Sequence, residues 1–265
     1  MPDQRLDAAL AARGIVRSRT QAARFIHEGS VTIDGALAIR ASTKVSDEQV
    51  LALTAIDHYV SRAAHKLLAA LDAFGLQVTG RHVFDVGAST GGFSQVVLER
   101  GAESVVALDV GHGQLDELIA RNERVTVIEG FNARDLTVAD LDAAAKHPVR
   151  ASLVVADLSF ISLTTVLPAL ATTVGPQADY VLLIKPQFEV GRTGIREGIV
   201  HNPSLRSEAI SGVLWAAWDV GLPTAGLIES PLLGNAGNHE YLAWFSVASG
   251  SNPTEWGDRV NDLSQ

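Results

Sequence analysis

Four charged residues of this chain occupy positions at which side chains can carry out acid–base chemistry. Asp157 and Lys185 end the apolar runs LVVAD and YVLLIK, Glu240 opens the apolar run EYLAWFSV, and Lys66 ends the basic segment SRAAHK. Open α/β sheets place their sites at the ends of buried strands. Two lysines and two carboxylates in such settings could take a proton from a hydroxyl and orient it. Each residue alone is better explained as a snorkelling lysine or a strand-end carboxylate, and the residue types alone do not bring the four together.

The composition describes an ordinary globular chain. It has 265 residues, of which 47% are hydrophobic and 19% charged, enough for one large domain or a small domain joined to a medium one. The absence of cysteine excludes a disulfide framework and a thiolate metal site, which fits a reducing, cytoplasmic location. The start of the sequence lacks the apolar segment of a secretory signal. The eight histidines are scattered without ligand spacing, so we expect no metal.

The most apolar stretch, 153–174, is better explained without a membrane. It contains Asp157, Pro168 and several hydroxyl side chains. A spanning helix needs about 20 predominantly apolar residues, and a charge within it costs several kcal/mol. A buried strand, a loop and a helix fit this stretch better, and no membrane partner is expected.

Charge is distributed unevenly along the chain. Residues 1–66 hold nine Lys/Arg against seven Asp/Glu, a balance of +2, whereas residues 67–265 hold twelve against twenty-three, a balance of −11. Affinity for nucleic acid depends on where basic groups cluster rather than on the net charge of −9. The front segment is therefore the place to look for an RNA contact.

That front segment has the pattern of a small α+β unit. Leu6, Ala9 and Leu10 share one helical face, Ser18 suits an N-cap with Gln21 three residues later, and Asp34-Gly35 is a strong hairpin signal between 31–33 and 37–39. The segment RLDAALAARGIVRSRTQAARFIHEGSVTIDG resembles the αL RNA-binding module, the ribosomal protein S4 type. Arginines beside a helix start suit phosphate, although charge alone also fits a solvated basic face. The candidate RNA-binding residues are Arg5, Arg13, Arg17, Ser18, Arg19, Arg24 and Arg62.

Alternating strand and helix patterns after residue 80 predict a mostly parallel sheet with helices on both faces. The expected strands are 82–86, 104–109, 125–128, 152–157, 180–185, 224–229 and 241–247. The last two leave no room for a helix between them, so the final strand should be antiparallel. This α/β pattern resembles the seven-stranded Rossmann-like sheet of S-adenosylmethionine-dependent methyltransferases. We expect four segments: an RNA-binding domain at 1–53, a linker at 54–61, an FtsJ-like methyltransferase domain at 62–249, and a loosely held polar tail at 250–265.

A glycine-rich turn marks the expected donor site. In FDVGASTGGF the glycines follow a strand and open a helix with the spacing G-x-x-x-G-G, which differs from the dinucleotide fingerprint. Asp109 ends the second strand, where a carboxylate can accept both ribose hydroxyls of a nucleoside. Asn132 follows the third strand and could contact an adenine edge or simply form a turn. The candidate cofactor-binding residues are Asp85, Gly87, Ser89, Gly91, Gly92, Phe93, Asp109, Asn132 and Asp157.

Longer segments along residues 5–247 resemble the TlyA family of ribosomal RNA 2′-O-methyltransferases, whose members are often named hemolysins. They are VSRAAHKL, DVGASTGGF, LDVGHGQL, FNARDL, VVADLSFISL, LIKPQFEVG, GIVHNP and GNHEYL. The resemblance implies that Lys66, Asp157, Lys185 and Glu240 act together as the catalytic set. We assign Lys185 as the base that takes the 2′-hydroxyl proton, with Lys66 as the neighbouring cation that holds the 2′-oxygen. Asp157 and Glu240 would orient the lysines.

The resemblance also implies the partners. They are S-adenosyl-L-methionine as cofactor and cytidines of ribosomal RNA in 30S subunits, 50S subunits or both, with the chain acting as a monomer. Two positions depart from the family: Asp57-His58-Tyr59-Val60 replaces an R-x-W-V linker, and His112 replaces a common tyrosine. Three alternatives remain: a catalytically inactive RNA-binding protein on this fold, a membrane-damaging hemolysin, and a small-molecule methyltransferase. The last leaves the front module unexplained.

Overall fold

The computed structural model describes residues 4–16, 18–27, 29–38, 40–53, 58–191, 194–234 and 237–265, without the side chains of Arg24 and His27. The chain divides into two compact units, Met1–Arg62 and Ala63–Gln265. Each unit has its own buried apolar cluster.

The first unit packs two helices against short strands. Its elements are β1 (Gln4–Arg5), α1 (Leu6–Ala12), α2 (Arg19–His27), β2 (Val31–Ile33), β3 (Ala36–Leu37), β4 (Lys44–Val45) and β5 (Leu51–Leu53). The strands form a three-stranded sheet in the order β3-β2-β5 and a β1-β4 pair. The predicted apolar face of α1 is fully buried: Leu6, Ala9 and Leu10 are 0% exposed and anchor the small core.

Two local predictions in this unit are confirmed. The Ser18 Oγ accepts a hydrogen bond from the Gln21 backbone N–H at 3.2 Å, as an N-cap should. Asp34 and Gly35 both have positive φ, 51° and 82°, and connect the antiparallel strands β2 and β3. Positive φ at both central residues is the requirement of the tight hairpin turn that this residue pair favours. Ile39, expected to continue the second strand, lies outside the described residues.

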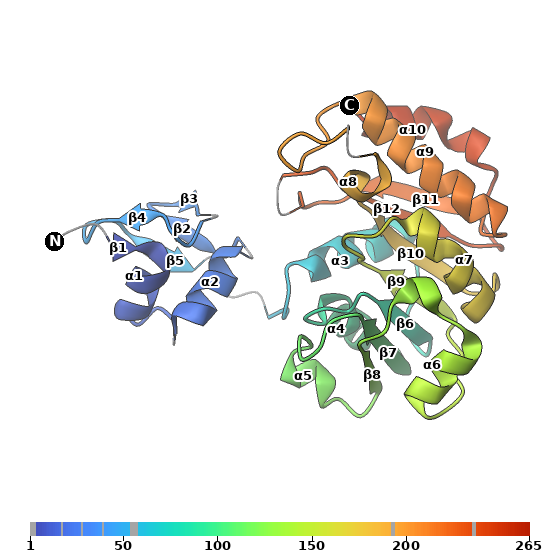
Figure 1. The fold of residues 1–265 in the computed structure, drawn as a ribbon, viewed down its shortest axis with the longest axis horizontal. Coiled ribbons are helices and arrows are strands. Elements are labelled where there is room, and N and C mark those ends of the chain that lie inside the picture. Colours follow the sequence, from blue (N-terminus) through green and yellow to red (C-terminus); the bar gives the residue numbers. More distant parts are fainter. Residues whose placement is uncertain are drawn as a thin grey trace. The chain divides into compact units, whose positions relative to one another are not determined.

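The second unit is built on a seven-stranded sheet (Figure 1). Its strands are β6 (His82–Val86), β7 (Ser104–Asp109), β8 (Val125–Glu129), β9 (Leu153–Ala156), β10 (Asp179–Ile184), β11 (Thr224–Glu229) and β12 (Tyr241–Phe245). They lie in the order β11-β12-β10-β9-β6-β7-β8. Strand β12 runs antiparallel to β10 and β11, which confirms the predicted reversal. Every predicted strand is present, with ends within two residues of the expected bounds.

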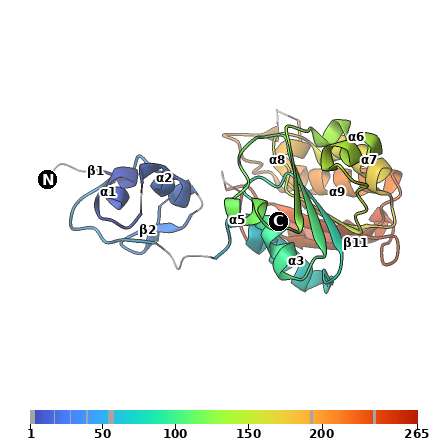
Figure 2. The same cartoon turned by 90° about the horizontal axis from the view of Figure 1, so that it is seen from below.

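Helices cover both faces of the sheet. In chain order they are α3 (Ala63–Phe74), α4 (Gly92–Glu99), α5 (Glu117–Ala120), η1 (Ala133–Asp135), α6 (Val138–Ala145), α7 (Leu163–Val174), α8 (Pro186–Glu189), α9 (Pro203–Asp219), η3 (Pro253–Trp256) and α10 (Gly257–Leu263). Figure 2 shows α6, α7 and α9 on one side of the strands and α3 on the other. The strands between them are therefore apolar on both faces, as the continuous runs in the sequence predict.

The expectation of a loosely held tail at 250–265 is wrong. This segment forms η3 and α10, and Val260 is 2% exposed within the main core. Trp256 and Leu263 also pack against that core. Positions 256, 260 and 263 follow a helical period, so one apolar stripe is buried while the polar residues within α10 face solvent. The polar composition of the segment obscured that stripe.

Candidate active site

The four candidate catalytic residues meet at one edge of the sheet because of strand register. Ala156 of β9 pairs with Val86 of β6 and with Leu182 of β10, so β6 and β9 end at the same level and β10 continues two residues further. Ile184 pairs with Tyr241 at the start of the antiparallel β12. The next residue beyond each of these ends carries the functional group: Asp157 after β9, Lys185 after β10 and Glu240 before β12.

The four side chains form two buried ion pairs. Lys185 Nζ lies 2.6 Å from Asp157 Oδ1, and Lys66 Nζ lies 2.5 Å from Glu240 Oε2. Lys66 reaches the edge from α3, which packs against β11 and β12. All four side chains are less than a fifth exposed. Buried charges need such partners, because an unpaired one would lose its hydration without compensation.

Neighbouring loops hold these pairs in place. The Lys185 ammonium also donates a hydrogen bond to Ser159 Oγ at 2.9 Å, in the loop after β9. The backbone of Glu240 accepts a hydrogen bond from the Ser230 N–H at 2.8 Å. A side chain at Gly234 would collide with the Glu240 carboxylate, so that position requires glycine. Neither Ser159 nor Gly234 stands out in the sequence, because their roles depend on contacts between separate loops.

Beside the Lys185–Asp157 pair lies a cavity of about 600 Å³. Five of the candidate cofactor residues line it: Gly87, Ser89, Asp109, Asn132 and Asp157. A Cβ added at Gly87 would lie 2.9 Å from the Asp157 carbonyl oxygen, and Gly87 has a φ of 82°. Only glycine permits this close approach at the floor of the cavity.

The polar groups of this cavity suit a nucleoside. The Asp109 carboxylate accepts backbone N–H bonds from Ser89 at 2.8 Å and from Gly111 at 2.7 Å, which fixes its orientation. Each carboxylate oxygen keeps a further lone pair that can accept from a ribose hydroxyl. Asn132 Oδ1 accepts from the Arg134 N–H at 3.0 Å, so its turn-forming role is present in the structure. An adenine contact by Asn132 stays a prediction.

The other four candidate cofactor residues do not line the cavity. Gly91, Gly92 and Phe93 form the glycine turn and the first turn of α4. A side chain at Gly91 would strike Leu115, and its φ is 94°. The exposed His112, one of the departures from the family pattern, lies against Gly130 and is also absent from the cavity wall.

Asp85 is a fully buried carboxyl beneath the glycine turn. It accepts a hydrogen bond from Ser94 Oγ at 2.6 Å, while its Oδ1 has no hydrogen-bond partner among the described residues. Burial raises the pKa of Asp85 to about 7; the Ser94 hydrogen bond opposes this rise, and the nearby Asp157 carboxylate adds to it. Asp85 therefore holds a proton near neutral pH much more readily than an exposed aspartate does.

One aromatic residue that sequence reasoning missed projects from the cavity rim. Phe160 is 92% exposed, lines the cavity and has a φ of 64°, in the left-handed region that bulky residues rarely adopt. Its ring centroid lies 5.3 Å from that of Phe188, whose ring centroid is 6.0 Å from Lys185 Nζ. An exposed aromatic side chain beside a charged site offers a flat surface on which a nucleobase can stack. No periodicity in VVADLSFISL distinguishes this phenylalanine from its buried neighbours.

In the first unit, Asp7 organises two of the candidate RNA-binding arginines. Arg5 forms a two-pronged contact to the Asp7 carboxylate at 3.0 and 3.1 Å, and Arg19 adds a third at 3.1 Å. The hydrogen bond from Arg5 is the main cause that lowers the pKa of Asp7 to about 2. The two guanidinium groups are about half exposed, so they are fixed side by side with donors still facing solvent.

The remaining candidate RNA-binding residues differ in their settings. Arg13 donates to the backbone carbonyls of Ser46 and Gln49, both at 2.7 Å, and so braces the loop between β4 and β5. Ser18 caps α2. Arg17 and the side chain of Arg24 lie outside the described residues, as does Asp57 of the expected linker. Arg62 ends the first unit.

The described residues lack two features that other classes of protein require. No described helix is long and apolar enough to cross a membrane. Within the same residues, no group of three or more histidine, aspartate or glutamate side chains is arranged to hold a metal ion.

Family comparisons agree with this geometry. Residues 59–247 match the FtsJ-like methyltransferase family, and residues 4–51 match the S4 domain. The chain is therefore an S-adenosylmethionine-dependent methyltransferase of the FtsJ-like class that carries an S4 domain. The glycine floor, the Asp109 carboxylate and the cavity volume fit this donor.

Individual relatives narrow the class. The 16S/23S rRNA (cytidine-2′-O)-methyltransferase TlyA of Mycobacterium tuberculosis is 48% identical over 243 residues, 91% of this chain and 88% of that protein. Hemolysin A of Brachyspira hyodysenteriae is 35% identical, covering 92% of this chain and 100% of that protein. A solved structure from Streptococcus thermophilus that carries a hemolysin name has a TM-score of 0.76 and 35% identity, covering 100% of this chain and 95% of that one. This chain belongs to the TlyA family.

Asp109→Asn should weaken donor binding. Hydrogen bonds to a charged group contribute about 1.5–3 kcal/mol, so the dissociation constant for S-adenosylmethionine should rise about tenfold to 150-fold. Isothermal titration of the full chain measures it. Asp140→Asn, on the exposed part of α6, is the matched control and should leave the affinity unchanged. Equal affinities for the wild type and Asp109→Asn would remove Asp109 from the donor site.

Asp85→Asn should flatten the pH dependence of stability. The folded pKa of Asp85, about 7, exceeds the value of about 4 for an exposed aspartate. Between those values unfolding releases a proton, so the wild type loses stability as pH rises from about 4 to about 7. The free energy of unfolding of Asp85→Asn, relative to that of the wild type, should therefore increase over that pH range, on the order of 1 kcal/mol per pH unit. Urea unfolding of both proteins between pH 5 and pH 8 tests this; parallel curves would contradict it.

Proposed function

We propose that this chain transfers a methyl group from S-adenosyl-L-methionine to the ribose 2′-hydroxyl of cytidine in ribosomal RNA. The observation that carries this proposal is the arrangement of two buried lysine–carboxylate pairs next to a nucleoside-sized cavity, with Asp157 belonging to both the pairs and the cavity wall. The methyl donor in the cavity and the proton-accepting Lys185 would thus both lie next to the Asp157 carboxylate. The TlyA relative of Mycobacterium tuberculosis, named for this reaction, supports the same substrate.

The reaction needs a side chain that accepts the proton of the ribose hydroxyl. When bound, the donor supplies a methyl group on a sulfonium, and a ribose hydroxyl is a poor nucleophile until its proton leaves. We assign Lys185 to take that proton as the oxygen–methyl bond forms and the sulfur–methyl bond breaks, which requires the Lys185 ammonium first to lose a proton to solvent. Asp157 and Ser159 fix the direction of the Lys185 amine. The Lys66–Glu240 pair would hold the 2′-oxygen.

Phe160 would receive the base of the target nucleotide. A ribose inside a folded RNA reaches a recessed site only when its nucleotide leaves the stack, and a flipped base is commonly held by aromatic stacking. Phe160 is exposed at the cavity rim, and its ring contacts Phe188, which in turn lies near the proposed proton acceptor Lys185. The cytosine ring would stack on Phe160 while its ribose faces Lys185.

The S4 domain would supply affinity for the ribosomal subunit. Arg5 and Arg19, held together by Asp7, can contact phosphates through their outward donors. Ribosomal subunits as substrates would place the chain in the cytoplasm, acting as a monomer without a metal. We include both 30S and 50S subunits as substrates, since the Mycobacterium tuberculosis relative is named for 16S and 23S rRNA.

One experiment tests the reaction and the substrate together. Tritiated methyl transfer from S-adenosylmethionine would be measured on separated, unmodified 30S and 50S subunits, followed by mapping of the labelled ribose. Label on cytidine ribose supports the proposal, and the labelled subunit shows whether one or both are substrates. Donor binding without incorporation into either subunit would contradict it and favour an inactive RNA-binding protein or another RNA.

Lys185→Arg should abolish catalysis while keeping the ion pair. Arginine retains the positive charge beside Asp157 but cannot give up its proton in a protein. Loss of a general base typically slows a reaction about 10²- to 10⁴-fold. Single-turnover methyl transfer at saturating donor measures the loss, and Lys185→Ala should match it. Lys146→Arg, at the end of α6, is the control. A rate for Lys185→Arg within about tenfold of the wild type would exclude Lys185 as the base.

Phe160→Ala should weaken use of the RNA without affecting the donor. Base stacking on an aromatic side chain contributes about 1–3 kcal/mol, so kcat/KM for the ribosomal subunit should fall about fivefold to 150-fold. Phe160→Trp keeps a stacking face and should retain most activity. The dissociation constant for S-adenosylmethionine should stay the same in both variants. An unchanged kcat/KM for Phe160→Ala would show that the ring does not hold the base.

A further inference from the structure

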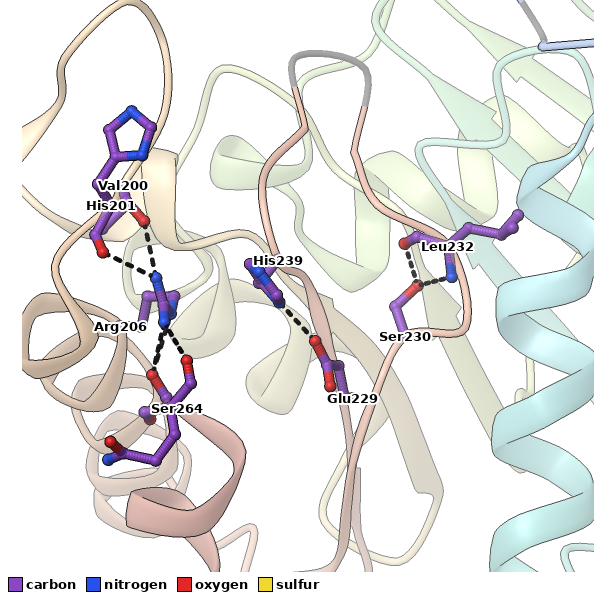
Figure 3. A network of polar contacts seen from close by, with 9 residues as sticks. Val200, His201, Arg206, Glu229, Ser230, Leu232, His239 and Ser264 are labelled. Carbon is purple, nitrogen blue, oxygen red and sulfur yellow. Dashed lines mark hydrogen bonds and ion pairs between the residues drawn. The ribbon is translucent and has the colours of Figure 1, made fainter. Parts of the chain in front are cut away.

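Arg206 of α9 is a buried guanidinium that the proposed chemistry does not use. It is 6% exposed and donates hydrogen bonds to four backbone oxygens (Figure 3). Nη1 donates to Val200 at 3.2 Å and to His201 at 3.1 Å. Nε and Nη2 donate to Ser264 at 3.1 and 2.7 Å, and Nη2 also donates to Gln265 at 2.6 Å. Burying a charge is costly, so such a group usually holds a particular arrangement.

This guanidinium joins segments that are far apart in the sequence. On one side are the residues that follow α10, and on the other is the loop that leads into α9. Five donors in a rigid plane can fix several carbonyls at once, which a lysine ammonium cannot do in the same geometry. The position of the loop at 198–201 therefore depends on how the end of α10 is docked.

The same loop contacts the segment that carries Glu240. The side chain of Asn238, 2% exposed, accepts from the Val200 N–H at 3.0 Å and donates to the Gly198 carbonyl at 2.7 Å. Its backbone carbonyl accepts from the Gly234 N–H at 2.8 Å. Asn238 thus ties the loop to the chain two residues before Glu240.

The other side of this segment is held separately. Figure 3 shows His239 against Glu229, with Nδ1 and Oε1 2.5 Å apart, and Ser230 bonded to the backbone of Leu232. The His239–Glu229 contact joins the end of β11 to the start of β12, and the Ser230–Leu232 contact fixes the turn that follows β11. On the side that faces the loop at 198–201, the segment before Glu240 is restrained by Asn238, which contacts the loop, and by Arg206, which binds carbonyls of the same loop.

We propose that Arg206 is a positioning residue for the Lys66–Glu240 pair, acting through Val200 and Asn238, and that the backbone of Ser264 and Gln265 belongs to the same path. The inference rests on the proposed methyl transfer. The 2.5 Å contact between Lys66 and Glu240 depends on the position of the Glu240 side chain. Arg206 restrains the loop at 198–201, and Asn238 connects that loop to the segment that carries Glu240. Misplacement of a catalytic group by about 1 Å can cost roughly a hundredfold in rate.

A double-mutant cycle separates positioning from simple stabilisation. Arg206→Lys keeps a positive charge but cannot hold the four carbonyls in one plane. Its single-turnover methyl-transfer rate at saturating donor and ribosomal subunit should fall about tenfold or more in the wild-type background. In a Glu240→Gln background the same substitution should cost less than about twofold, because the pair it positions is already broken. The dissociation constant for S-adenosylmethionine should change less than about twofold in either background.

The matched control is Arg259→Lys. Arg259 lies on α10 and donates to the Leu227 carbonyl of β11 at 3.2 Å, so it anchors the same helix to the sheet rather than to the loop. Its rate should stay within about twofold of the wild type. If Arg206→Lys fails to fold, Asn238→Ser carries the same cycle, since it removes the link next to Glu240.

Besides an unaffected Arg206→Lys rate, three outcomes would overturn the inference. They are equal losses for Arg206→Lys in the two backgrounds, an equal loss in Arg259→Lys, and a fall in rate fully explained by weaker donor binding. The failure of the proposed function looks different: the unaltered chain would then transfer no methyl group to either subunit. A wild type that transfers methyl, with an unaffected Arg206→Lys, would leave the function standing and reject the path.

Discussion

The cost of burying charge at the edge of a sheet constrains this molecule more than any other interaction. Strands β9, β10 and β12 are apolar on both faces and lie next to Asp157, Lys185 and Glu240, so these ionisable residues lose water when the helices cover the sheet. The structure meets this constraint by pairing: Lys185 with Asp157, and Lys66 with Glu240. Because the partners come from different elements, forming the pairs also fixes α3, β9, β10 and β12 relative to one another.

The same constraint explains the differences among the buried acids. Asp157 and Glu240 lie next to lysines, whereas Asp85 accepts hydrogen bonds from the uncharged Ser94, and burial raises the pKa of Asp85 to about 7. Asp7 in the S4 domain shows the opposite effect, since two arginines lower its pKa to about 2. Three settings for the same kind of side chain thus produce an ion-pair partner, a proton holder and an anchor for cations.

Much of this architecture could be predicted from local patterns. The strands at 82–86, 104–109 and 224–229 have the predicted bounds, since strand ends coincide with changes from apolar to polar residues. The hairpin at Asp34 and Gly35 follows from backbone preference alone. The pairing of Lys66 with Glu240 could not be derived this way, because 174 positions separate the two residues. The helix at 257–263 was missed because its few apolar residues lie within a polar composition.

Phe160 shows a further limit of sequence reasoning. Its exposure is set by a backbone conformation with a φ of 64°, and that conformation persists only because the surrounding loop imposes it. The imposing contacts come from separate elements: Ser159 is bonded to Lys185 after β10, and Phe188 of α8 packs against the Phe160 ring. Strain of this kind costs on the order of 1–3 kcal/mol and clusters where function requires a fixed side chain. The loop therefore links the direction of the proposed base, through Ser159, to the place where a nucleobase would stack.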